Sequence, residues 1–139
     1  MKVIVDSNIF LNVMNHEAHE KSSYAFLKSL GQKNIGFISS VQIPEIYKSV
    51  FNAQDEEAAI SSLGYIKNIA AIIPCTEEIA FQAASIYQKY KRQTQKFSII
   101  DAIIVGTALN AKADFLVTRD PDFDNVTEVK AKKPENILQ

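Results

Sequence analysis

The 139-residue chain has little of what several protein classes depend on. Its single cysteine, Cys75, excludes an internal disulfide, and no Cys/His cluster has zinc spacing, so an intracellular protein is expected. None of its four glycines forms GxxxxGK[ST] or GxGxxG, which argues against P-loop and dinucleotide-binding sites. No apolar run has membrane-spanning length, and the start MKVIVDSN meets a carboxylate too early for a signal peptide. We therefore expect a cytoplasmic protein.

The chain also lacks an excess of either charge. Its formal net charge is −1, so no overall basic field attracts nucleic acid, and any RNA contact must come from a local patch. The hydrophobic fraction of 47% and the charged fraction of 22% are ordinary for a globular protein. A chain of this length can bury a core without disulfides, so we expect a single domain over residues 1–139.

Short β-branched runs alternate with segments of helical period. The expected strands are 2–5, 35–38, 71–73, 115–117 and, more weakly, 126–129. The expected helices are 17–30, 55–69, 77–90 and 98–111. In the first helix, Tyr24, Leu27 and Leu30 fall on one face. This alternation predicts a three-layer α/β/α sandwich around a mainly parallel sheet of four or five strands.

Acidic residues follow the expected strands. Ligands of open α/β sheets bind beyond the carboxyl ends of the strands. Asp6 ends the first strand, and Asp120 follows 115–117. Glu45 starts the helix after the second strand, and Asp101 lies one turn into the apolar helix 98–111. We expect these four carboxylates to meet at one edge of the sheet.

Three of these acids also have simple structural explanations. Asp6 could cap the following helix, and Asp120 could belong to a turn. Glu45 could be placed in the first helical turn because a negative charge is stabilised by the positive end of the helix dipole. Each is weak support for a functional site when taken alone. Their convergence on one edge carries the interpretation.

Asp101 is the most informative single acid. Its neighbours on both sides are apolar, and a carboxylate in an apolar helix costs stability unless it is paired or binds a cation. The structural alternatives are a helix cap or a salt bridge to Lys96 or Arg119. Four clustered carboxylates would repel one another, and hard divalent ions such as Mg²⁺ or Mn²⁺ relieve such repulsion. Such a site can activate water for attack on a phosphodiester.

Four strings of the sequence, in this order, resemble the PIN domain nucleases: VDSNIFL, SSVQIPEI, DAIIVGTAL and LVTRDPDF. The resemblance covers nearly the whole chain and is strongest to the VapC-type toxins of prokaryotic toxin–antitoxin pairs. It implies an α/β/α fold, Mg²⁺ or Mn²⁺ dependence, RNA cleavage, a cognate antitoxin and a symmetric dimer. It also implies that the metal-binding acids are Asp6, Glu45, Asp101 and Asp120.

The resemblance extends to polar neighbours of the acids. Ser7 and Asn8 match the small polar pair after the first acid, and Thr118 matches a hydroxyl before the last one. All three are expected to support the metal ligands by hydrogen bonding.

Two positions depart from the family pattern. Pro44 stands directly before Glu45, where an ordinary helix former is usual, and this affects the direction of Glu45. Asp120 is followed by Asp122 and Asp124, and either of these could approach the metal instead. We favour Asp120 because it comes directly after the strand.

A basic segment precedes Asp101. Lys91, Arg92 and Lys96 lie in the stretch YKRQTQKF, and we predict that they contact RNA phosphates. The alternative is a solvated helix end, where basic residues are favoured by the helix dipole.

Rival functions remain open from sequence. A phosphatase of the haloacid-dehalogenase type also begins with an Asp after its first strand, but it needs a second Asp two residues later, where this chain has Asn8. A receiver domain needs paired early acids and a lysine late in the chain, for which Arg119 is a poor substitute. A PIN-like binding module with a decayed site is the non-enzyme alternative.

Apolar faces at 24–30 and 55–69 favour a homodimer.

Overall fold

The computed structural model describes residues 1–138, and a five-stranded parallel sheet organises them. The strands are β1 (Lys2–Val5), β2 (Ile35–Ser39), β3 (Ala70–Ile73), β4 (Phe115–Val117) and β5 (Lys130–Lys132). Their order across the sheet is β3-β2-β1-β4-β5, and every neighbouring pair is parallel. β1 is therefore central, and the carboxyl ends of all five strands meet at one edge of the sheet.

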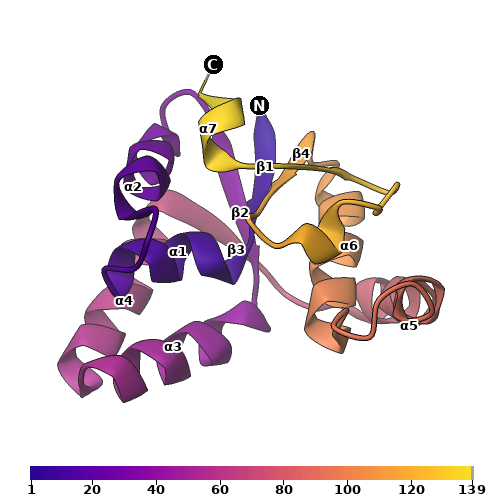
Figure 1. The fold of residues 1–139 in the computed structure, drawn as a ribbon, viewed down its shortest axis with the longest axis horizontal. Coiled ribbons are helices and arrows are strands. Elements are labelled where there is room, and N and C mark those ends of the chain that lie inside the picture. The colour runs from indigo at the N-terminus through magenta and orange to yellow at the C-terminus, as the bar shows by residue number, and fades with distance from the viewer. Residues whose placement is uncertain (139) are drawn as a thin grey trace.

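Helices cover both faces of this sheet (Figure 1). One layer holds α1 (Ser7–Met14), α2 (Glu20–Ser29), α3 (Gln42–Ala53), α4 (Glu56–Ile69) and α7 (Pro134–Ile137). The other holds α5 (Glu77–Lys91) and α6 (Ile99–Ala111), and a short 3-10 helix, η1 (Pro121–Phe123), follows β4. Within residues 1–138, none of these helices is long and apolar enough to span a bilayer.

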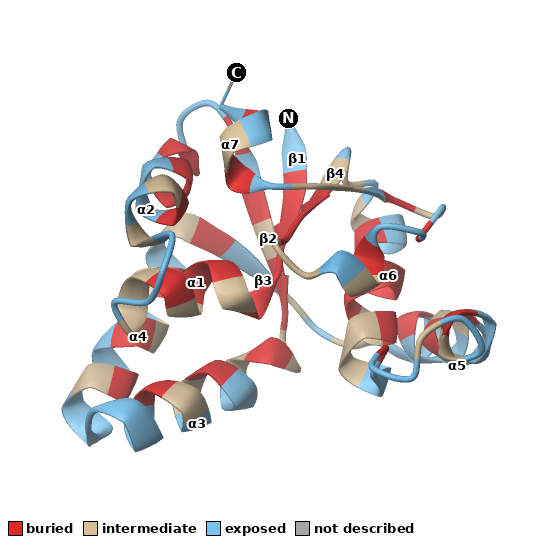
Figure 2. Ribbon diagram, in the orientation of Figure 1, coloured by how far each residue is buried: buried red, intermediate tan, exposed pale blue. Residues whose placement is uncertain are grey.

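The central strand supplies both cores. Successive side chains of a strand point to opposite faces, so Val3 and Val5 enter the core under α1–α4, while Ile4 enters the core under α5 and α6. Figure 2 shows β1 as buried along almost its whole length. The three-layer α/β/α sandwich predicted from the alternating pattern is confirmed.

The fifth strand lies elsewhere than predicted. The expected strand 126–129 is wrong, because β5 runs from Lys130 to Lys132 and pairs with β4. Val126 and Val129 are buried, but they pack into the core under α5 and α6 as part of the connection to β5. Lysines at both ends of an edge strand discourage pairing with another chain. They also leave β5 without the apolar alternation by which a strand is predicted from sequence.

Helix α2 is turned relative to the prediction. Tyr24 is 44% exposed, whereas Leu27 and Leu30 are buried as expected. Ser23 and Phe26, both fully buried, take the inward positions instead.

Phe97 holds the segment between α5 and α6 against the core. It is fully buried, and its ring lies 5.3 Å from that of Tyr90 and 5.9 Å from that of Phe123, measured between centroids. We predict that Phe97→Ala lowers the free energy of unfolding by about 3–5 kcal/mol, measured by urea denaturation. Phe81, which is 71% exposed, is the matched control, and Phe81→Ala should stay within about 0.5 kcal/mol of the unchanged protein. Equal losses in both variants would contradict the packing role of Phe97.

Candidate active site

Asp6 stands where the central strand becomes a helix. It follows β1, caps the amino end of α1 and is only 7% exposed. Its Oδ1 accepts a hydrogen bond from the Ser7 backbone N–H at 2.7 Å. Its Oδ2 accepts from Thr118 Oγ1 at 2.7 Å and from Asn8 Nδ2 at 3.2 Å. The cap expected as an alternative explanation is therefore real, but it uses one oxygen of a carboxylate that also joins β4.

Thr118 connects two of the predicted acids. Its hydroxyl donates to Asp6 and accepts from the backbone N–H of Asp120 at 3.0 Å. The backbones are joined as well, since Asp6 N donates to Val117 O at 3.0 Å. This double link fixes Asp120 relative to Asp6 across neighbouring strands, which is the geometry that the predicted supporting role of Thr118 requires.

Ser7 and Asn8 both lie against Asp6. The Ser7 hydroxyl accepts from Gln42 Nε2 at 3.1 Å, which connects α1 to the start of α3. Asn8 donates through its amide nitrogen, while its Oδ1 is buried and has no hydrogen-bond partner within residues 1–138. A buried acceptor without a donor is costly, so this oxygen leaves capacity for a donor beside Asp6.

Asp101 closes a capping box at the start of α6. The backbone N–H of Ser98 donates to Asp101 Oδ2 at 2.9 Å, and the backbone N–H of Asp101 donates to Ser98 Oγ at 3.1 Å. This arrangement satisfies two free donors of the helix end. Of the two structural alternatives, the cap is confirmed. Within residues 1–138 no salt bridge joins Asp101 to Lys96 or Arg119.

The aspartates interact through their charges. The pKa of Asp6 is raised from 3.8 to about 7, first by burial and then by the charges of Asp101 and Asp120, against the hydrogen bonds from Thr118 and Ser7 that lower it. The pKa of Asp101 is also raised, first by burial and then by the charges of Asp120 and Asp122. Asp120 thus acts on both other acids, whereas Asp122 acts on Asp101. This supports the choice of Asp120.

Glu45 is carried by α3, the helix that follows β2. It is exposed on the first turn of α3 and is not among the main causes of the raised pKa of Asp6 or of Asp101. It lines a groove between α1 and α3 with Leu11 and Lys48. Within residues 1–138, no three His, Cys, Asp or Glu side chains stand close enough together to hold a metal ion as a group.

Gln42 fixes the start of α3 and was missed by the sequence analysis. It is fully buried and accepts from the Ser39 backbone N–H at 2.9 Å, while its amide nitrogen donates to Val5 O at 2.9 Å. These bonds tie the helix that carries Glu45 to the ends of β1 and β2. A glutamine between apolar neighbours gave no signal of this role.

The basic segment before Asp101 is tied to the acidic site. Thr94 Oγ1 lies 3.4 Å from Asp122 Oδ1 and donates to it, which holds the segment against η1. Lys91 donates to the backbone oxygen of Gln95 at 2.8 Å, so its ammonium group stabilises the segment itself. Arg92 and Lys96 are exposed. Their contact with RNA stays a prediction.

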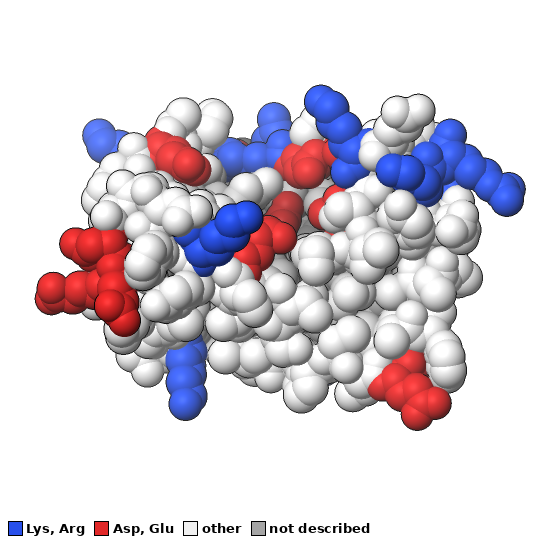
Figure 3. Space-filling view, turned by 90° about the horizontal axis from the view of Figure 1, so that it is seen from below, with Lys and Arg blue, Asp and Glu red and all other residues white. Residues whose placement is uncertain are grey.

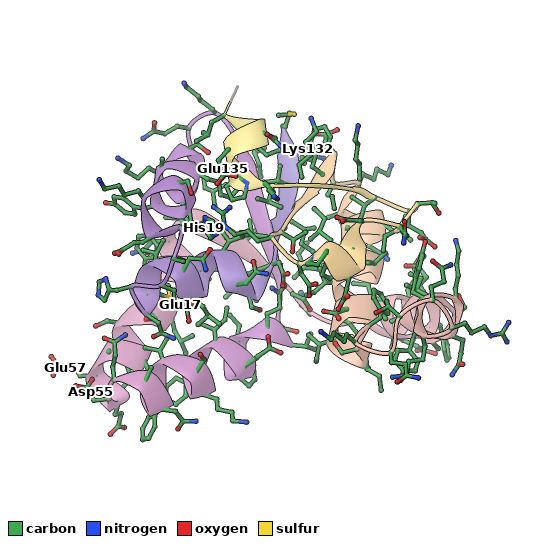
Figure 4. The ribbon with its side chains drawn as sticks, viewed as in Figure 1. Glu17, His19, Asp55, Glu57, Lys132 and Glu135 are labelled. Atoms are coloured by element: carbon green, nitrogen blue, oxygen red, sulfur yellow. The ribbon has the colours of Figure 1, made fainter. Side chains whose placement is uncertain are left out.

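Arg119 turns away from the acids beside it. Its guanidinium donates to Asn12, Ser22 and Ser23, and it forms an ion pair with Glu135 at 2.6 Å. This pairing holds the pKa of Glu135 down at about 2. Figure 4 shows Glu135 on α7, at the end of the molecule away from the α3–α4 turn. Arg119 therefore anchors the chain next to Asp120 to α1, α2 and α7, and it leaves the acids unneutralised.

On the surface, acidic side chains gather in a hollow near the middle of the face shown in Figure 3, with Lys and Arg side chains around its upper rim. The acids thus form a recess of negative charge that is bordered by positive charge. Such an arrangement suits a cation in the recess and a polyanion across it.

A comparison with protein-family profiles agrees with this geometry. The profile described as "PIN domain" matches residues 3–129. The chain belongs to the PIN domain family. A comparison with curated proteins finds no significant match.

Solved structures share the fold of this PIN domain. VapBC2 from Rickettsia felis, bound to a DNA fragment from its promoter, matches with a TM-score of 0.78 and 22% identity, over 96% of this chain and 98% of that chain. VapBC-1 from nontypeable Haemophilus influenzae matches with a TM-score of 0.75 and 20% identity, over 97% and 99% of the two chains. VapC20 from Mycobacterium tuberculosis, a sarcin-ricin loop cleaving toxin, matches with a TM-score of 0.74 and 16% identity, over 92% of this chain and 98% of that chain.

The buried carboxylate of the PIN domain gives a pH dependence of stability. Between its unfolded pKa of 3.8 and its folded pKa of about 7, Asp6 keeps a proton that the unfolded chain has lost. The free energy of unfolding should therefore fall as pH rises from 5 to 7 in metal-free buffer. Asp101 contributes with the same sign, since its pKa is also raised. The pKa of Glu135 is lowered from 4.5 to about 2, so its effect on the free energy of unfolding lies mainly below this pH range.

The measurement is the melting temperature with chelator at pH 5, 6 and 7. Asp6→Asn cannot titrate, so its melting temperature should decline less than that of the unchanged protein. Parallel declines in the two proteins would show that Asp6 does not carry the effect.

Proposed function

We propose that this PIN domain is a metal-dependent endoribonuclease that cleaves RNA phosphodiester bonds. The observation that carries the proposal is the electrostatic coupling of Asp6, Asp101 and Asp120 at the carboxyl edge of the sheet. Structural carboxylates are normally paired with cations, whereas here the guanidinium of Arg119, next to Asp120 in the sequence, is bound to Glu135. We assign residues 1–139 to one nuclease domain, because both helix layers build on a single sheet.

The donor set fits Mg²⁺ or Mn²⁺. It consists of carboxylate oxygens, which hard divalent ions prefer, and a bound cation would offset both the burial and the repulsion that raise the pKa of Asp6. Within residues 1–138 no three acids form a ready-made cage, but Mg²⁺ keeps several waters and needs only one or two direct carboxylates. Asp6, Asp101 and Asp120 would hold the metal directly or through such waters, and Glu45 would complete the set from α3. When bound, the metal lowers the pKa of a water molecule and stabilises charge on the phosphodiester.

The remaining polar groups position the acids. Thr118 and Ser7 hold the two oxygens of Asp6, while the capping box fixes Asp101 on the first turn of α6. Asn8 offers its free Oδ1 as an acceptor beside Asp6. Lys91, Arg92 and Lys96 lie on the segment that Thr94 ties to Asp122, and we assign them to RNA phosphates.

The biological role proposed is that of a toxin in a toxin–antitoxin pair. Two of the structures with the same fold are VapBC complexes, and VapC20 is a toxin that cleaves the sarcin-ricin loop. We therefore propose a cognate antitoxin and action on cytoplasmic RNA. A homodimer is proposed as well, since Tyr24 on α2 and Ile60 on α4 are 44% and 57% exposed on the helices singled out by sequence.

The phosphatase alternative is disfavoured by Asn8. A haloacid-dehalogenase-like enzyme needs an acid at that position, whereas here the Asn8 amide donates to Asp6. A decayed binding module would have no reason to keep a carboxylate buried at a cost, as Asp6 is.

Two amide substitutions test the site. Asp6→Asn and Asp101→Asn keep the shape of the side chains and the caps but remove one charge each. Both should abolish RNA cleavage while keeping or raising the melting temperature of the metal-free protein, because repulsion is relieved. Mg²⁺ or Mn²⁺ should stabilise the unchanged protein by about 2.7 kcal/mol at a hundredfold excess over its dissociation constant. The variants should lose most of this gain, measured by thermal unfolding.

Asp55→Asn is the matched control, since Asp55 is an exposed helix cap at the start of α4, far from the site (Figure 4). It should leave cleavage and the metal-dependent stabilisation unchanged. Retention of both properties in Asp101→Asn would make Asp101 a structural cap and would contradict the proposed site.

Assembly gives a separate test. We predict a dimer by light scattering at micromolar concentration, and loss of cleavage when a small protein encoded next to this one is added. The expected antitoxin should raise the melting temperature by mass action. A monomer under these conditions would contradict the dimer, and full cleavage in the presence of every neighbouring gene product would contradict the toxin role.

A further inference from the structure

The strand ends place two lysines in line with the acids. The register pairs Val5 with Val117 and Val117 with Lys132, so the next residues, Asp6, Thr118 and Lys133, form one row across the edge of the sheet. The hydrogen bond from Thr118 N to Lys132 O, 3.0 Å long, fixes this row. Neighbouring strands are about 4.8 Å apart, so the backbone of Lys133 lies roughly 10 Å from that of Asp6.

A cleft of about 460 Å³ joins this end of the row to the site. Thr118, Asp120 and Asp124 line one wall, and Lys132, Lys133 and Asn136 line another. Arg119 also contributes to the lining, but its charge is taken up by Glu135. Asp120 is shared between the cleft and the acidic site, so a ligand can extend from one into the other.

The lysine wall carries free positive charge. Within residues 1–138, no ion pair joins Lys132 or Lys133 to an acid. Lys133 is exposed, and the ammonium group of Lys132 lies 4.0 Å from the centroid of the Phe115 ring, which restricts its side chain. Phe115 does not line the cleft, so Lys132 supports the site mainly through its position on β5, and Lys133 is the lysine whose charge is free there.

We propose that Lys133, supported by Lys132, binds the RNA backbone at a phosphate next to the one that is cleaved. This inference rests on the proposed nuclease function. A strand whose cleaved phosphodiester lies at the aspartates must continue past the edge of the acidic recess, where the carboxylates repel it. The cleft beside Asp120 offers the nearest cations on the β5 side, opposite to the segment that carries Arg92 and Lys96. Because the RNA strand is continuous with the cleaved phosphodiester, it would run from the aspartates into the cleft past Asp120, which lines both.

The test is the salt dependence of RNA binding. A labelled single-stranded oligoribonucleotide is titrated in Ca²⁺ buffer and followed by fluorescence anisotropy, for the unchanged protein, Lys133→Gln and Lys132→Gln/Lys133→Gln. Each lost contact should make the log–log salt slope less negative by about 0.7. Between 50 and 200 mM salt, the affinity advantage of the unchanged protein over the double variant should shrink about sevenfold, from two such contacts.

Two matched variants control for charge. Lys67→Gln removes an exposed lysine at the end of α4, close to the start of β3 and so at the opposite edge of the sheet, and should leave the slope unchanged. Lys133→Arg keeps the charge and should restore the slope. In Mg²⁺, the double variant should raise KM for RNA and keep kcat, because it loses binding without loss of the acids. Equal melting temperatures will show that the fold is intact.

The outcomes separate the two proposals. A double variant with an unchanged slope, in a protein that still cleaves RNA, overturns the lysine subsite and leaves the nuclease function standing. If the double variant loses binding to an acidic partner protein while its RNA binding is unchanged, the lysine subsite is also overturned. A protein that neither binds nor cleaves RNA overturns both.

Discussion

The burial of one carboxylate, that of Asp6, organises both the fold and the site. Its two oxygens take hydrogen bonds from the start of α1 and from the end of β4, so the central strand, a helix and a neighbouring strand meet at this group. A charge in this position is expensive, and the pKa of about 7 reflects that expense. The carboxyl group is therefore stable when it is protonated or when a cation lies beside it. The ionised group without a cation is its least stable state.

Most elements could be predicted from sequence because their signals are local. β1 and β4 were placed at their observed residues, since short runs of β-branched and apolar residues between helical periods have few other solutions. β5 was missed because its residues, KAK, have no apolar alternation, and its place is decided by pairing with β4. Tyr24 was misplaced because Ser23 faces inward to accept from Arg119, and a buried polar partner overrides hydrophobic periodicity.

The same distinction separates the predictable and unpredictable parts of the site. The strand-end rule brings Asp6 and Asp120 together without any knowledge of side-chain contacts, and the apolar helix around Asp101 marks that acid as a candidate. The roles of Gln42 and Arg119 depend on partners 37 and 107 residues away in sequence, so no local pattern could reveal them. Glu45 shows the limit of the rule, since it lies on a helix six residues after the end of β2, and its position depends on how Gln42 holds the start of α3.

The hydrogen bond from Thr118 to Asp6 spans 112 positions of the chain. During synthesis the first strand leaves the ribosome early, but its partner β4 emerges only with the last quarter of the sequence. Until then, Asp6 has neither its hydroxyl donor nor the second acid, and the sheet lacks a central pairing. The arrangement therefore leaves this edge of the sheet incomplete until translation is almost finished, which separates the making of the polypeptide from the moment at which the site is assembled.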